Sequence, residues 1–289
     1  MDLMCCESEV IQQSYEDPVL LKDNRVLQNL LATEDKYVPM TCYFNCVQTD
    51  IRSYMRKMVA QWMLEVCEEQ RCEDEVFPLA VNYLDRVLCV RDLNRTSLQL
   101  LGAACMFLAS KLKETTPLTA EKLVVYTDNS IQLHELMEME SLVLQCLKWD
   151  LSAVTPHDFL EQILSRLDIS AEKGQTLKRH AQTFISLCAT DCKFMLYPPS
   201  MIAAGSVGAA CQGLSQTLNS HSNMKFLEKL HKITGIELDC LRSCQEQIEQ
   251  TVASNLSNLV PEAPETPTKS DPLKSQPTTP TDVRDIHLI

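Results

Sequence analysis

Acidic side chains gather in a short stretch that could carry general acid–base chemistry. Glu68 and Glu69 are adjacent, and Glu73, Asp74 and Glu75 follow within a few residues. Two neighbouring carboxyl groups can act as general acid and general base. This charged stretch, however, lies between the apolar stripes of two expected helices, which is typical of a solvated loop. No Gly-rich phosphate loop, Gly-x-Ser-x-Gly or His-Glu-x-x-His motif occurs, and the six histidines are scattered. The sequence therefore predicts a binding protein that is not an enzyme and has no cofactor.

Fourteen cysteines could instead hold metal or form disulfides. Zinc ligands are usually spaced as Cys-x-x-Cys, which is absent, and a spacing of four also lies on one face of a helix. A large chain with its own apolar residues and no export signal does not need disulfides. We interpret the cysteines as reduced thiols that fill the core, with no metal site. The pairs closest to a ligand spacing are Cys42/Cys46, Cys188/Cys192 and Cys240/Cys244.

Composition narrows the class of protein. The 289 residues are 45% hydrophobic and 22% charged, which excludes a wholly disordered chain. The net charge of −13 disfavours binding to nucleic acid or to anionic lipid, because cationic contacts supply that affinity. No apolar run approaches the ~18 residues of a membrane span, and the start lacks a basic region before an apolar one. We expect protein partners, with no nucleic acid and no membrane.

Apolar residues recur at helical spacing through most of residues 20–255, and no long stretch alternates with period two. Only six glycines are present, which also disfavours hairpins. The sequence therefore predicts an all-α fold. A short first helix around residues 26–31 is expected to close at Pro39. The further helices expected in the first half span 51–66, 75–90, 97–113, 119–126 and 132–148.

A second set of helices is expected from residue 153. Thr155 can cap a helix, Pro156 suits its first position, and Asp158 is favourable in its first turn. An Ala- and Gly-rich segment at Leu101 has a counterpart at Met201, and small side chains let helices approach closely. Each segment is predicted to be the central helix of its bundle. The second set spans 156–167, 173–192, 199–214, 223–233 and 237–256.

The ends of the chain differ from the middle. From about Asn258, prolines alternate with Thr, Ser and Lys, and such a segment buries too little apolar surface to fold. The expected organisation is a flexible N-terminal segment, a first bundle with a preceding helix, a second bundle and a disordered tail. These parts span 1–20, 21–152, 153–256 and 257–289.

Four runs carry a resemblance to a known family. They are MRKMVAQWMLE from Met55, VFPLAVNYLDR from Val76, LQLLGAACMFLASKLKE from Leu98 and LKWDL from Leu147. In this order they resemble the cyclin box, and LMCCE near the start with TPTDVRD in the tail resembles D-type cyclins in particular. The resemblance covers essentially the whole chain and implies two tandem five-helix bundles. It also implies a regulatory subunit that binds and activates a cyclin-dependent kinase and promotes passage from the first gap phase into S phase.

The resemblance places the kinase contact on Lys111 and Glu140. Kinase activation requires that a regulatory helix bring its Glu to the ATP-binding Lys, and a donor with an acceptor can fix the backbone at that helix's end. From the residues alone, Lys111 equally suits the last turn of a helix, where it complements the dipole. Glu140 is likewise one acid beside Glu135 and Glu138.

Met55, Val59 and Trp62 are spaced i, i+4 and i+7, which is typical of a stripe that faces the core. The resemblance implies instead that this helix exposes a groove for Arg-x-Leu segments of substrates and inhibitors, with an acid that pairs with the Arg. Met58 stands where the family often has a β-branched residue, which alters the shape of the groove. The implied groove residues are Met55, Met58, Val59, Trp62, Glu65, Leu98 and Gln99.

The N-terminus contains Leu3-x-Cys5-x-Glu7, which has the form of the linear motif that docks into retinoblastoma-family pocket proteins. The motif is short, and matches of this kind arise by chance. Its position before any helical pattern strengthens it, because an extended segment there is free to bind a partner.

In the tail, Thr279 and Thr266 each precede a proline, the form that proline-directed kinases prefer. Phosphate adds charge and acceptors that a receptor can read. For Thr279 the D-type resemblance implies a phosphorylated signal for nuclear export and for a ubiquitin ligase, in a protein that shuttles between nucleus and cytoplasm. Thr266 equally suits a plain linker.

A second hypothesis is a cyclin-fold transcription factor that binds DNA and polymerase machinery. Such a protein should present a basic face, which the net charge of −13 disfavours. The expected partners are therefore a cyclin-dependent kinase catalytic subunit, retinoblastoma-family pocket proteins, Arg-x-Leu kinase inhibitors and a ubiquitin ligase.

Overall fold

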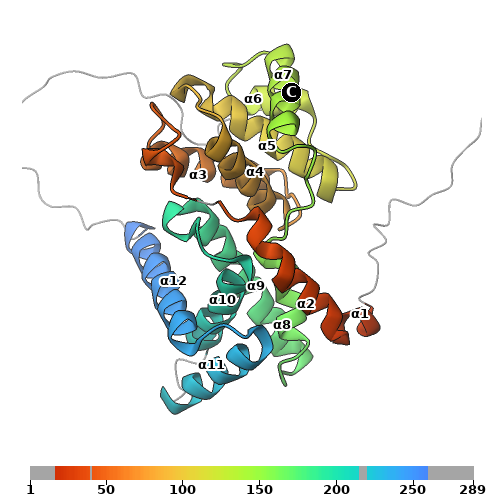
Figure 1. Ribbon diagram of the computed structural model, residues 1–289, viewed down its shortest axis with the longest axis vertical. Coiled ribbons are helices and arrows are strands. Elements are labelled where there is room, and N and C mark those ends of the chain that lie inside the picture. The colour runs from red at the N-terminus through yellow and green to blue at the C-terminus, as the bar shows by residue number, and fades with distance from the viewer. Residues whose placement is uncertain (1–16, 40, 215–219, 260–289) are drawn as a thin grey trace, which may run out of the picture.

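The computed structural model describes residues 17–39, 41–214 and 220–259, and every regular element in these ranges is helical. The all-α prediction and the two five-helix bundles are confirmed, and Figure 1 shows the bundles stacked end to end. The first bundle contains α3 (Ser53–Glu69), α4 (Val76–Val90), α5 (Leu98–Lys113), α6 (Ala120–Tyr126) and α7 (Leu133–Cys146). The second contains α8 (Pro156–Leu164), α9 (Ala171–Thr190), α10 (Pro199–Leu214), α11 (Ser220–Thr234) and α12 (Leu238–Leu259).

The two helices rich in small residues are central, as predicted. Helix α5 contacts α3, α4, α6 and α7, and α10 contacts α8, α9, α11 and α12. A Cβ at Gly102 would lie 2.9 Å from Val59 Cγ1, and one at Gly205 would lie 2.8 Å from Cys244 Sγ. Both separations are shorter than real contacts, so the absence of a side chain lets α5 approach α3 and α10 approach α12.

Helix α8 begins as its sequence predicts. The Thr155 backbone N–H donates a hydrogen bond of 2.6 Å to Asp158 Oδ2, and Pro156 occupies the first turn. The reciprocal bonds form a capping box, which satisfies N–H groups that have no partner within the helix.

The N-terminal helix differs from its prediction, because the chain forms two helices that break at Asp23. They are α1 (Pro18–Lys22) and α2 (Asn24–Thr33), and Asp23 caps the second by accepting a 2.9 Å hydrogen bond from the Arg25 backbone N–H. Helix α1 thus begins inside the segment expected to be flexible. A 3₁₀ turn at Glu34–Tyr37 follows, so α2 ends before Pro39.

Helix α2 lies against the second bundle, although it precedes the first in sequence (Figure 1). Leu27 is buried among Phe159 and other core side chains of the second bundle. The Glu34 carboxylate accepts hydrogen bonds of 2.7 Å each from the backbone N–H and the hydroxyl of Ser200. Burial nevertheless raises the pKa of Glu34 above its ordinary value. The segment therefore fastens the chain's start to α10.

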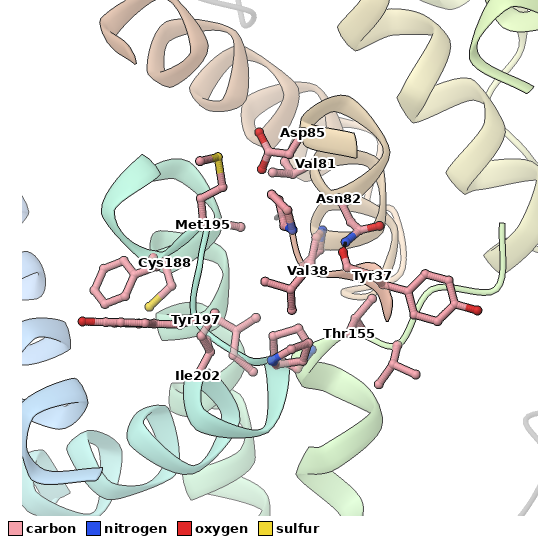
Figure 2. A pocket seen from close by; sticks show the side chains of 18 of the residues that line it. Tyr37, Val38, Val81, Asn82, Asp85, Thr155, Cys188, Met195, Tyr197 and Ile202 are labelled. Carbon is pink, nitrogen blue, oxygen red and sulfur yellow. Dashed lines mark hydrogen bonds between the residues drawn. The ribbon is translucent and has the colours of Figure 1, made fainter. Parts of the chain in front are cut away.

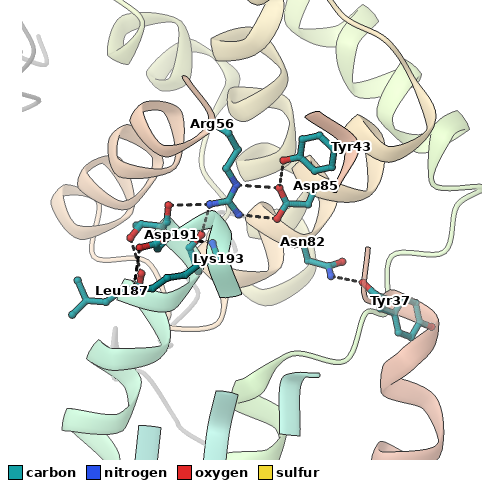
Figure 3. Close-up of polar contacts among 10 residues, drawn as sticks. Tyr37, Tyr43, Arg56, Asn82, Asp85, Leu187, Asp191 and Lys193 are labelled. Atoms are coloured by element: carbon teal, nitrogen blue, oxygen red, sulfur yellow. Dashed lines mark hydrogen bonds and ion pairs between the residues drawn. The ribbon is translucent and has the colours of Figure 1, made fainter. Parts of the chain in front are cut away.

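A buried ion pair between α3 and α4 of the first bundle also contacts the second bundle (Figure 3). Arg56 is 1% exposed and Asp85 is 4% exposed, and their Nη2 and Oδ2 atoms lie 2.7 Å apart. Arg56 Nη1 also donates to the backbone oxygens of Ala189 at 2.6 Å and Thr190 at 3.1 Å, at the end of α9. Tyr43 donates its hydroxyl hydrogen to Asp85 at 2.7 Å. One guanidinium thus holds the first bundle to the second.

Beside this ion pair lies a cavity of about 80 Å³ between the bundles. Figure 2 shows Tyr37, Asn82 and Asp85 on one side of it and Cys188 and Tyr197 on the other. Its lining is mostly apolar, and the Asn82 amide nitrogen is held by the backbone oxygen of Tyr37 at 2.9 Å. The cavity is a small gap in the packing beside the Arg56–Asp85 ion pair.

The cysteines only partly fill the core. Cys67, Cys105, Cys188 and Cys244 are buried, and burial raises the pKa of the Cys105 thiol well above its ordinary value. The core interpretation is wrong for Cys42, Cys46 and Cys240, which are exposed because their helix or turn faces solvent at those positions. Among the described residues, no three His, Cys, Asp or Glu side chains form a cluster that could hold a metal ion. None of the described helices has the length and apolarity to cross a membrane.

Candidate functional sites

The structure brings Lys111 and Glu140 together, although 29 residues separate them. Lys111 lies in the last turn of α5, and its Nζ is 2.6 Å from Glu140 Oε1 on α7. The ammonium also lies 3.6 Å from the centre of the Phe107 ring. The Lys111 and Glu140 side chains are 42% and 15% exposed. A donor and an acceptor therefore meet where α5 and α7 lie side by side, and both side chains keep some exposed surface.

The two neighbouring acids on α7, Glu135 and Glu138, do not pair with Lys111. Glu135 accepts a 2.7 Å hydrogen bond from the backbone N–H of Gln132 and so caps the start of the helix. Glu138 is exposed. Of the three acids, only Glu140 forms an ion pair with Lys111 in the structure. The assignment of Lys111 and Glu140 to kinase binding stays a prediction.

Helix α3 presents a second, apolar surface beside its core face. The buried side chains of α3 include Ala60, Met63 and Val66, whereas Met55 and Val59 are only partly buried. Met58 is 60% exposed. Met55, Val59 and Trp62 pack against the core of the first bundle, as their spacing indicates, and each is only partly buried.

Trp62 is fixed at this border. Its ring is partly buried against the core of the first bundle, and its indole N–H donates a 3.3 Å hydrogen bond to the backbone oxygen of Tyr126. Buried indole groups usually find such a partner, and the Trp62 side chain as a whole is partly buried. Glu65 follows one turn later and is exposed.

The α5 side of the predicted groove is less open. Leu98 is 3% exposed and belongs to the core of the first bundle, so little of its surface is accessible to a peptide. Leu98 begins α5 directly after the 3₁₀ turn at Arg95–Ser97. Gln99 is partly exposed. We call the accessible set Met55, Met58, Val59, Trp62, Glu65 and Gln99 the α3 patch.

The buried Arg56–Asp85 ion pair, which we call the clamp, was not predicted from the sequence. A signal was present, because Arg56 shares a helix face with Ala60 and Met63 at spacings of four and seven. A charged residue on an apolar face is almost never fully buried unless it is paired. The partner on α4 could not be read from this pattern.

Comparison with known proteins decides the family. The model of the cyclin N-terminal domain matches residues 25–152, and that of the cyclin C-terminal domain matches residues 154–268. The chain is 57% identical over 290 residues to G1/S-specific cyclin-D2 of Mus musculus and 54% over 296 residues to G1/S-specific cyclin-D3 of Homo sapiens, with 100% of each chain covered. It is 54% identical over 288 residues to G1/S-specific cyclin-D1 of Danio rerio, with 99% of each covered. The chain belongs to the D-type cyclins.

A solved structure agrees with this family. A viral cyclin from herpesvirus saimiri superposes with a TM-score of 0.73 at 28% identity, covering 82% of this chain and 100% of its own. Membership makes this D-type cyclin a protein of the kind that regulates cyclin-dependent kinases in the cell cycle. The predictions at Leu3, Cys5, Glu7, Thr266 and Thr279 fall outside the described residues of this cyclin.

Proposed function

We propose that this cyclin binds and activates a cyclin-dependent kinase through the surface around Lys111 and Glu140, and is not itself an enzyme. The observation that carries the proposal is the meeting of an exposed Lys and a partly exposed Glu where α5 and α7 converge. Mixing the full chain with purified kinase catalytic subunits should raise phosphotransfer, while the chain alone should transfer no phosphate. Phosphotransfer by the isolated, kinase-free chain would refute the non-catalytic role.

The α3 patch docks Arg-x-Leu segments of substrates and inhibitors under this proposal. The Leu of such a segment can pack on Met58 and Trp62, and its Arg can pair with the exposed Glu65 carboxylate. Such a surface suits recruitment, because aromatic side chains at an interface carry a large share of binding energy.

Truncation of the α3 patch should weaken peptide binding without unfolding the chain. Trp62→Ala should cost roughly 2 kcal/mol of binding to an Arg-x-Leu peptide, measured by titration calorimetry against an Arg-x-Ala control peptide. Because Trp62 also contacts the core, Met58→Ala is the second variant, since its side chain is 60% exposed. Val90→Ala on α4, also well exposed, is the matched control and should bind normally. Equal loss of peptide and kinase binding, or no loss in either variant, would contradict the α3 patch as a docking site.

The two ends of the chain carry separate signals in this proposal. Leu3, Cys5 and Glu7 recruit retinoblastoma-family pocket proteins as substrates, which promotes passage from the first gap phase into S phase. Phosphorylated Thr279 directs export from the nucleus and capture by a ubiquitin ligase, so the protein shuttles between nucleus and cytoplasm. Sequence pattern and family resemblance support both roles.

Variants at the two ends of the chain should act independently, so each variant serves as the control for the other. Cys5→Ala with Glu7→Ala should weaken capture of a retinoblastoma pocket domain and leave cellular lifetime unchanged. Thr279→Ala should lengthen lifetime and increase the nuclear fraction, because alanine cannot acquire phosphate charge, and should leave pocket capture unchanged. Pulse-chase and pull-down measure the two readouts. An unchanged lifetime with phosphate still on the tail would move the assignment to Thr266 or Thr281, and an unchanged lifetime without tail phosphate would refute the switch.

A further inference from the structure

A cleft of about 540 Å³ separates the C-terminal end of α3 from α9, away from the Lys111–Glu140 pair. Leu64 and Phe77 line its first-bundle side, and Arg179 and Gln182 line its second-bundle side. Two cysteines, Cys67 and Cys72, also belong to this lining. Neither cysteine takes part in the proposed kinase or peptide contacts, although both lie at the wall of an accessible cleft.

The end of α3 brings these two cysteines together. The Cys72 backbone N–H donates a 2.9 Å hydrogen bond to the Cys67 carbonyl, and the Arg71 N–H donates one of 3.1 Å to Glu68. Arg71 has a φ of 53°, in the left-handed region. These are the three features of a Schellman motif, in which the side chains three residues before and two after the helix cap contact each other. Cysteine occupies both contact positions. A disulfide requires that its two Cα atoms lie within about 7 Å of each other, and the Schellman motif brings these two positions into contact.

The two thiols are chemically unequal. The hydrogen bond between the thiols lowers the pKa of Cys72 below its ordinary value and raises that of Cys67 well above it. Cys72 is partly exposed, whereas Cys67 is buried and lies 4.0 Å from the Met106 sulfur on α5. An accessible thiol with a lowered pKa is the one that reacts with an oxidant, and a buried neighbour can then resolve the product.

We propose that Cys67 and Cys72 form an oxidisable dithiol that a hydroperoxide converts reversibly into an intramolecular disulfide on the wall of this cleft. The Cys72 thiolate attacks one peroxide oxygen, the O–O bond breaks, and protonation yields Cys72 sulfenic acid and water or an alcohol. The Cys67 sulfur then attacks the Cys72 sulfur, and the sulfenic oxygen leaves as a second water with the Cys67 proton. Both sulfurs are oxidised by one electron each, and the peroxide takes up the two electrons. A dithiol reductant reverses the reaction by thiol exchange.

Hydrogen peroxide and the full chain provide the test. After treatment and alkylation of the remaining thiols, peptide mapping should find a disulfide between Cys67 and Cys72, with loss of two hydrogens, and dithiothreitol should restore both thiols. In Cys67→Ser, where the serine hydroxyl can still donate a hydrogen bond to Cys72, peroxide should convert Cys72 to sulfenic acid, and its dimedone labelling should be about ten times that of the exposed Cys240. Cys46→Ser is the matched control, because Cys42 and Cys46 are exposed thiols at a similar spacing, and it should leave the Cys67–Cys72 disulfide unchanged.

Two results would overturn the proposal. One is a wild-type chain in which peroxide oxidises Cys240 while Cys67 and Cys72 stay reduced. The other is a disulfide map in which Cys72 pairs with a different cysteine. The wild-type map needs no substitution, so it decides the matter even if Cys67→Ser fails to fold. Kinase activation plays no part in the readout, so the dithiol and the proposed function stand or fall separately.

Discussion

Replacing Arg56 with methionine is expected to lower the free energy of unfolding by about 3–5 kcal/mol, the cost of leaving one partner of a buried ion pair without the other. The substitution would strand the Asp85 carboxylate, which is 4% exposed, and would remove the hydrogen bonds to the end of α9. Burial by itself lowers the pKa of Arg56, but Asp85 outweighs it, so the net pKa lies above the ordinary value. The guanidinium therefore stays charged, and its loss removes a full charge from the pair.

Urea unfolding followed by circular dichroism measures this effect. Arg95→Met is the matched control, because Arg95 faces Asp50 at 3.9 Å with both side chains exposed. Exposed pairs contribute about 0–1 kcal/mol, so the control should stay near the wild type. In the double variant Arg56→Met with Asp85→Leu, both charges are gone, and the loss should be smaller than in Arg56→Met alone. Equal effects of Arg56→Met and Arg95→Met would show that the clamp contributes little.

Reversing the charge of Lys111 is expected to weaken kinase binding roughly 100-fold or more, the scale of truncating a charge at the centre of an interface. Helical content and unfolding should change little, because the Lys111–Glu140 pair is at the surface. Pull-down of the catalytic subunit and phosphotransfer to a pocket-protein fragment give the readout. Lys113→Glu is the matched control, since Lys113 also lies in the last turn of α5 but pairs with Glu75.

Exchange of the two charges separates a kinase contact from a structural pair. Lys111→Glu combined with Glu140→Lys can reform the ion pair between α5 and α7 with opposite polarity. If the pair serves only to hold those helices, the exchanged chain should bind kinase normally. If the kinase backbone reads a donor at Lys111 and an acceptor at Glu140, binding should stay lost, and that is the expected result. Recovery of activation in the exchanged chain would contradict the proposed kinase contact.

Local rules in the sequence determined the helices. Apolar spacing located the ten helices of the two bundles to within a few residues, because a helix needs one continuous apolar face and that face recurs every three to four residues. Thr155, Pro156 and Asp158 specified the start of α8, since caps act over a few neighbouring residues. Small side chains at Gly102 and Gly205 marked the central helices, because close approach depends on the size of the residue itself.

Only the tertiary structure decided which surfaces those helices share. Nothing near Asp23 in sequence indicates that α2 packs on the second bundle, and nothing near Arg56 names Asp85 as its partner. Leu98 is buried in the core of the first bundle, although its position in the family pattern suggested a place in the peptide groove. Lys111 and Glu140 meet only because α5 and α7 pack side by side. Such contacts join residues tens of positions apart, and they depend on how faces are paired among helices, which periodicity within one helix does not encode.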